Sequence, residues 1–222
     1  MKRTIILLLV LALGSGILLA QSINLKIGLF QPSLRSDLWQ DNMYNLAFNK
    51  TDMLNAYYGA EYEFFLDRYT SFSLETGSYS RDVYTQYRDY TYEDGGPILQ
   101  NISLRIIPIE ANIKLYPFGR RAVFFPFFGF GAGLYAWTYQ QYGDFVIFPD
   151  AYIEEGFAET RTFSIGFSGR AGLVYRFLPR MALAIEGKYQ YLRGRLSGYF
   201  EGFELLDLGG ITATVGIQFY FR

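Results

Sequence analysis

The chain has 222 residues, a formal net charge of −1, and neither cysteine nor histidine. The near-neutral charge argues against a nucleic-acid partner, and the lack of cysteine excludes disulfides and thiolate chemistry. Without histidine, the usual histidine-dependent hydrolytic mechanisms are excluded, so we predict no enzymatic activity. We also predict no cofactor and no metal site, since the acidic segments 94–96 and 154–156 lack the ligand spacing of a calcium loop.

The N-terminal stretch has the pattern of a secretory signal peptide. A charged start is followed by an apolar run from Ile5 to Leu13, and Ala20 is the predicted last residue removed. An uncleaved anchor helix is the alternative, but the run is too short to span a bilayer and is broken at Gly14–Gly16. We therefore predict a signal peptide over residues 1–20 and a single barrel domain over residues 21–222.

The mature part of the chain alternates apolar and polar residues in long segments, which is the pattern of β-strands with two different faces. Several of these segments have about 10 residues or more, the length of a tilted strand that crosses a bilayer. The eight predicted strands cover residues 23–29, 54–64, 71–77, 102–116, 127–136, 163–173, 183–191 and 211–221.

Short and long connections alternate strictly along the predicted strands. All short turns therefore fall at one end of the sheet, and because eight is an even number both termini fall there too. Outer-membrane barrels have this plan, with short periplasmic turns and long extracellular loops. The predicted turns are 66–69, 117–121 and 177–180, and the predicted irregular loops are 31–52, 80–100, 139–160 and 193–207.

The alternation changes phase once, in the strand that begins at Ile102. Ile102 to Ile106 are apolar at even numbers, whereas Ile109 onward is apolar at odd numbers. One extra residue near Ile107-Pro108 would restore the phase. A β-bulge supplies such a residue and tolerates a proline, so we predict a bulge there.

Alternation alone does not say which face points outward. A soluble lipocalin-like barrel would bury the apolar face. Three features favour the inverted arrangement: many Gly and Ser on the polar face, aromatic residues near strand ends on the apolar face, and near-balanced charges on the polar face. The fold predicted is all-β, an eight-stranded antiparallel up-and-down transmembrane β-barrel. The charges predicted to form a structural network in its lumen are Lys26, Glu61, Glu63, Glu75, Arg105, Glu110, Lys114, Arg170, Arg176, Glu186 and Lys188.

Four stretches carry a family resemblance: the signal peptide, Ile107–Phe118, Phe127–Tyr135 and Gly216–Arg222. Together they resemble the small bacterial outer-membrane β-barrel family of OmpX-, OmpW- and OmpA-barrel-like proteins, over the whole mature chain. The resemblance implies the outer membrane as location, with both termini in the periplasm, and lipid and lipopolysaccharide as surroundings. It also implies a barrel-assembly signal in the last strand, here Phe219 and Phe221, although Arg222 rather than an aromatic residue ends the chain.

The lumen charges could form a salt-bridged plug, an ion-selective pore or a proton path. Because eight strands leave a lumen only just filled by side chains, we favour the plug. The glycines at 129, 131 and 133 are expected to make room for large neighbours such as Tyr57 or Tyr116. The long loops could bind an extracellular ligand. Two functions stay open: a monomeric structural or surface-interaction barrel, and a passive transport barrel for small apolar molecules, as in OmpW-type proteins.

Overall fold

The computed structural model describes residues 21–147 and 152–221. The predicted signal peptide lies outside these residues, as does Arg222. No helix in the two described segments is long and apolar enough to cross a membrane.

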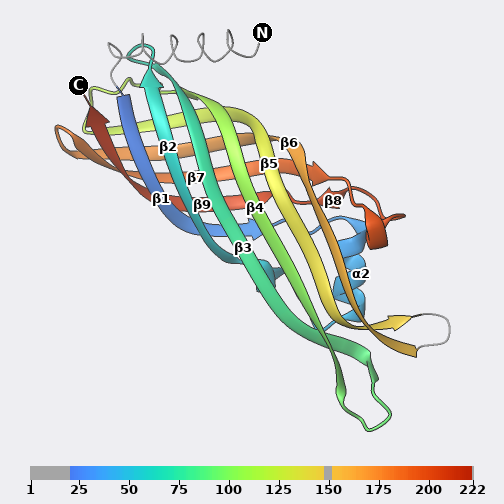
Figure 1. Cartoon of the computed structure of the whole chain (residues 1–222). Helices are drawn as coiled ribbons and strands as arrows, with labels where there is room; N and C mark the ends of the chain where they lie inside the picture. Colours follow the sequence, from blue (N-terminus) through green and yellow to red (C-terminus); the bar gives the residue numbers. More distant parts are fainter. Residues whose placement is uncertain (1–20, 148–151, 222) are drawn as a thin grey trace, which may run out of the picture.

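The described chain is a sheet of antiparallel strands with few helical turns (Figure 1). A helix, α2 (Asp37–Asn45), and three short elements lie in the connections: η2 (Lys50–Met53), η3 (Gly198–Phe200) and β8 (Leu206–Asp207). The eight long strands are β1 (Gln21–Pro32), β2 (Asn55–Phe65), β3 (Thr70–Thr91), β4 (Pro97–Leu115), β5 (Phe124–Ile147), β6 (Tyr152–Leu178), β7 (Met181–Gly194) and β9 (Gly210–Phe221).

Each long strand pairs with the long strands before and after it in the chain, and one further pairing, between the first and the last, closes the ring. β1 pairs with β9, and β7 lies between β6 and β9. Closure leaves no unpaired edge around the middle of the barrel, which a sheet surrounded by hydrocarbon requires. The eight-stranded antiparallel up-and-down barrel of the transmembrane type is therefore confirmed.

The two ends of the barrel differ, and we call them the turn end and the loop end. The turn end holds the three short connections, the start of β1 and the end of β9 (Figure 1). The loop end holds α2, η2, η3, β8, the ends of β3 and β5, and the starts of β4 and β6. The alternation of short and long connections predicted this arrangement.

The predicted loops 80–100 and 139–160 are wrong in their extent. Most of their residues continue the strands: β3 and β4 contain 22 and 19 residues, and β5 and β6 contain 24 and 27. These extensions form two hairpins that project from the loop end (Figure 1). They carry polar residues on both faces, so the alternation that marks a half-buried strand is lost there.

The predicted bulge at Ile107-Pro108 is also wrong. The pairing of β4 with β5 keeps one register from Ile106 through Ile109, and even-numbered residues of β4 point inward along its whole length. Ile102 and Leu104 are therefore inside the barrel. The change of phase in the sequence therefore has another cause. The inward-facing residues are charged near the middle of the barrel and apolar toward the loop end.

The outer face of the barrel is a broad apolar band. Phe130 has 71% of its surface exposed and Ile165 68%, although both lie in the middle of long strands. Large apolar side chains exposed in such number are disfavoured in water and favoured in lipid. The arrangement inverts that of a lipocalin-like barrel, because here the mid-barrel interior is charged and the outside is apolar.

Candidate functional site

The interior of the barrel brings together most of the charged side chains singled out in the sequence. Nine of the predicted lumen residues form one ion-pair cluster, which we call the lumen network: Lys26, Glu61, Glu63, Glu75, Glu110, Lys114, Arg170, Glu186 and Lys188.

The lumen network arises from an acidic wall that faces a basic one. Glu61, Glu75 and Glu110 are direct cross-strand partners on β2, β3 and β4. Carboxylates side by side repel each other. Arg170 and Lys188, which are partners on β6 and β7, supply compensating charge from across the lumen. The strand order and the inward parity together place these opposite charges within reach.

Arg170 is at the centre of the lumen network. One guanidinium nitrogen lies 2.6 Å from Glu75 and 3.5 Å from Glu186, and the other lies 2.7 Å from Glu110. The second nitrogen also donates a hydrogen bond of 2.7 Å to Asn112. A planar guanidinium with several fixed donors suits this bridging of separate carboxylates better than an ammonium group does.

Two lysines complete the centre of the lumen network. The Lys26 ammonium lies 2.9 Å from Glu61, 2.8 Å from Glu75 and 3.1 Å from Glu186. The Lys188 ammonium lies 3.1 Å from Glu75 and 3.2 Å from Glu110. Each ammonium thus faces at least two carboxylates.

Glu63 marks the side of the lumen network nearest the turn end. Its nearest cation, Lys114, is 3.9 Å away and lies much closer, at 2.6 Å, to Glu61. The Glu63 carboxylate accepts hydrogen bonds from the hydroxyls of Ser71 and Tyr116 instead. Neutral donors therefore provide most of its stabilisation.

The lumen network is dry. The side chains in its ion pairs are between 0 and 5% exposed. A water-filled channel running past these groups would leave accessible surface on them. Groups this deeply desolvated are stable only when well paired.

Two predicted members lie elsewhere. Arg105 is exposed on the outer face of β4, because the absent bulge leaves odd-numbered residues outside, so its placement in the lumen is wrong. Arg176 is near the turn end, where its guanidinium lies 4.8 Å from the centre of the Tyr220 ring and 5.3 Å from that of Phe125.

An aromatic layer closes the interior at the turn end. Tyr116, Phe125 and Phe127 are each at most 2% exposed. Arg120, in the turn between β4 and β5, places its guanidinium 3.7 Å from the centre of the Phe65 ring. Such stacking satisfies a cation at the mouth of a narrow barrel without an ion pair.

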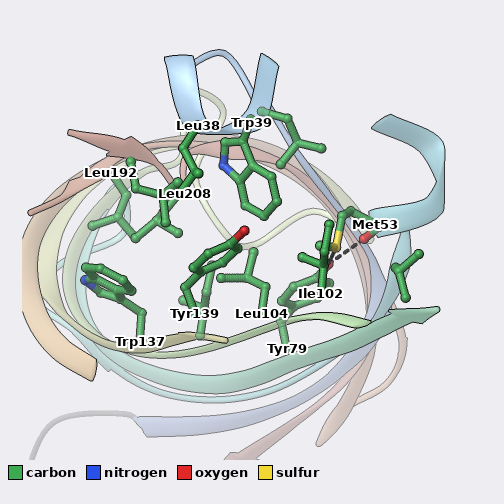
Figure 2. Close-up of a cluster of buried hydrophobic side chains, with 14 of the residues drawn as sticks. Leu38, Trp39, Met53, Tyr79, Ile102, Leu104, Trp137, Tyr139, Leu192 and Leu208 are labelled. Atoms are coloured by element: carbon green, nitrogen blue, oxygen red, sulfur yellow. Dashed lines mark hydrogen bonds between the residues drawn. The ribbon is translucent and has the colours of Figure 1, made fainter. Parts of the chain in front are cut away.

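A larger apolar layer, which we call the loop plug, closes the loop end. Its centre is Trp39 of α2, which is 0% exposed and lies edge-on to Tyr139 with ring centres 5.2 Å apart. Figure 2 shows Trp39 and Leu38 pointing from the helix toward Tyr139 and Leu104 of the wall. Loop-plug residues include Leu34, Leu38, Trp39, Leu46, Phe48, Met53, Ile102, Leu104, Trp137, Tyr139, Leu192 and Leu208.

Polar contacts fix α2 in the loop plug. The indole nitrogen of Trp39 donates to the carbonyl of Asp207 at 2.9 Å, and the Asn42 amide donates to the Tyr139 hydroxyl at 2.8 Å. The prediction of an irregular polar loop over residues 31–52 is therefore wrong, because this segment contains α2 and η2 and packs into the barrel. The available signal was the large apolar residues scattered through that stretch, which a solvated loop would not need.

The glycine row on β5 makes room, as expected, but for different neighbours. A Cβ at Gly131 would lie 1.9 Å from the Asn112 side chain, and one at Gly129 would lie 2.9 Å from that of Arg170. Tyr57 instead packs against two glycines on β2 and β3, Gly59 and Gly77. The glycine row thus admits the side chains of the lumen network. In the described segments no group of acidic residues is arranged to hold a metal ion.

No known family model matches this chain, and no curated protein matches its sequence. Solved structures do match its fold. The chain is similar to the crystal structure of the outer membrane protein OprG from Pseudomonas aeruginosa, with 12% identity and a TM-score of 0.59 over 92% of this chain and 96% of that one. It is also similar to a major outer membrane protein from Thermus thermophilus, with 10% identity and a TM-score of 0.56 over 91% of this chain and 99% of that one.

These similarities, at such low identity, concern the fold alone. They place the chain among the small outer-membrane β-barrels as a class of architecture, which confirms the resemblance in the sequence at that level.

Proposed function

We propose that this protein is a monomeric integral outer-membrane barrel with a structural or surface-interaction role and a closed lumen. The observation that carries the proposal is the filled interior: the turn-end aromatic layer, the dry lumen network and the loop plug follow one another along the barrel. The absence of histidine supports a non-enzymatic role.

The outer membrane is the location that best explains the apolar band and the closed ring of strands. The proposed surroundings are outer-membrane lipid and lipopolysaccharide. The proposed assembly signal for the barrel-assembly machinery is the end of β9, where Phe219 and Phe221 share the outer face. The projecting hairpins are the proposed site for an extracellular ligand.

Single-channel recording in planar bilayers tests the closed lumen. We expect the purified protein to insert without discrete conductance steps, because the lumen network leaves no water-filled path. A conducting porin in the same bilayers controls for fusion and recording conditions. Reproducible steps from this protein would contradict the plug.

A passive transport barrel is the second candidate. The observation in its favour is a partly open cavity of about 550 Å³ at the loop end. Its lining combines apolar side chains, such as Leu46, Phe145 and Phe200, with acidic ones, such as Asp41 and Glu154. Small apolar molecules could enter such a cavity. The lumen network lies between this cavity and the turn end, so passage would require the ion pairs to separate, and the same recordings would show conductance steps.

We propose that the loop end faces the outside and that both termini are periplasmic, since long loops are extracellular in this architecture. Glu93 and Arg121 are exposed residues at opposite ends of the barrel. We expect Glu93→Cys to react with an impermeant thiol reagent on intact cells, and Arg121→Cys to react only after the outer membrane is broken. The reverse pattern would invert the orientation.

A further inference from the structure

One row of outward-facing residues on β3 to β6 carries two arginines. In register, Ser80 pairs with Arg105, Arg105 with Thr138, and Thr138 with Arg161. Arg105 and Arg161 are exposed and lie two strands apart, so their backbones are separated by about 10 Å. The residue between them, Thr138, has a short side chain, so the two long arginine side chains lie on either side of a shallow depression in the outer surface.

The arginine row marks the boundary of the apolar band. The outward residues one step nearer the turn end are Ile107, Ala136 and Phe163, which are cross-strand neighbours. On β5 the outward residues from Phe124 to Ala136 are all apolar, and that stretch of a strand tilted by about 40° spans roughly 30 Å along the membrane normal. The arginines therefore lie where the headgroups of the loop-side leaflet begin.

A groove runs along this part of the wall. Its volume is about 580 Å³, and its lining includes both arginines, the polar residues Ser103 and Gln140, the acidic Glu159 and the apolar Phe163. The groove thus has a cationic and hydroxyl-bearing part above an apolar part. An amphiphile with a phosphate and sugar above acyl chains has the complementary distribution.

Two acidic residues lie close to the arginines, Glu159 in the lining of the groove and Asp82 in the same outward row as Glu159, but neither forms an ion pair with Arg105 or Arg161. Asp82 and Glu159 are in the next outward row toward the loop end, and the Glu159 carboxylate accepts a hydrogen bond from Gln140. Among the contacts of the described residues, the side chains of Arg105 and Arg161 have no ion pair and no hydrogen bond. Within the described part of the chain, two exposed guanidinium groups at a lipid interface thus lack an anion.

We propose that Arg105 and Arg161 bind the phosphate of a phosphorylated glycolipid in the loop-side leaflet, with the acyl chains on the apolar band and the sugar over Ser103 and Gln140. The inference rests on the proposed outer-membrane location and adds a lipid site to it. Guanidinium groups bind phosphate through paired, charge-assisted hydrogen bonds.

Native mass spectrometry of the detergent-solubilised protein, titrated with bisphosphorylated lipid A, tests the site. We expect saturable binding to the unmodified protein and a loss of affinity of about tenfold or more in Arg105→Gln/Arg161→Gln. Arg121→Gln/Arg180→Gln is the matched control, because it removes the same charge from exposed positions at the turn end. We expect the control to bind within about twofold of the unmodified protein.

Further arms identify the bound chemistry. Dephosphorylated lipid A should bind the unmodified protein about as weakly as lipid A binds the Arg105→Gln/Arg161→Gln variant. Inorganic phosphate alone should not compete at equal concentration, because it lacks the acyl chains. Equal lipid A binding by Arg105→Gln/Arg161→Gln and the unmodified protein would overturn the site. Each sample is first checked for barrel formation by its migration in SDS, so loss of the barrel is distinguished from loss of the site.

Discussion

Replacing Arg170 with methionine is expected to lower the free energy of unfolding by about 3–5 kcal/mol. The guanidinium contacts Glu75, Glu110 and Glu186, all buried. The substitution keeps an apolar stem of similar length but leaves these carboxylates with too little positive charge in a dry interior. Urea titration of the protein folded in lipid vesicles, followed by tryptophan fluorescence, measures the loss.

Arg121→Met is the matched control for this experiment. The same chemical change occurs at an exposed position in the turn between β4 and β5, where we expect an effect within about 0.5 kcal/mol. A loss below about 1 kcal/mol for Arg170→Met would contradict the dry lumen network, because solvated ion pairs contribute little to stability.

Replacing Phe130 with arginine is expected to cost about 2–4 kcal/mol of unfolding free energy in lipid vesicles, the range for arginine at the middle of a bilayer. Phe130 lies on the outer face of β5, between its cross-strand neighbours Ile113 and Gly169. Its large exposed area means that the cost comes from the surrounding lipid rather than from contacts within the protein.

Phe130→Leu is the control, since it shortens the side chain but leaves it apolar, and we expect a change of less than about 1 kcal/mol. If the outer face were in water, Phe130→Arg would be nearly neutral. A neutral result with a folded barrel would therefore contradict the assignment of this face to lipid.

The strands and their order could be predicted from the sequence because alternation survives wherever one face differs from the other. By this alternation Lys114 and Glu110 are expected on the inner face, and both are buried on β4. Alternation fails where both faces are alike, and the polar extensions of β3 to β6 were therefore predicted as loops.

The content of the interior could be predicted only in part. Alternation sorts residues into two faces but does not say which is inside, and the interior here changes from charged to apolar with depth. Because apolar residues were expected to face lipid, Ile102 and Leu104 were predicted outside and Arg105 inside. The structure has Ile102 and Leu104 buried and Arg105 exposed. The pairing of Arg170 with Glu75, on strands that are far apart in the chain, depends on how the closed barrel is sheared.

The part of the loop plug that comes from residues 31–52 was not predicted, because the apolar residues of this segment show no period. Trp39 and Phe48 are buried by a chain segment that folds back into the barrel mouth, a tertiary event with no local signature. A count of large apolar residues in residues 31–52 was the remaining clue.

Electrophoretic migration in SDS of the detergent-folded protein, with and without boiling, tests most directly whether this chain forms a closed barrel that belongs in a membrane. A ring of paired strands resists SDS until it is heated, so we predict that the unboiled and boiled samples migrate differently. We also predict that the protein does not form a folded, soluble monomer in buffer without detergent. Identical migration, together with recovery of residues 21–222 as a folded monomer in detergent-free buffer, would contradict the account.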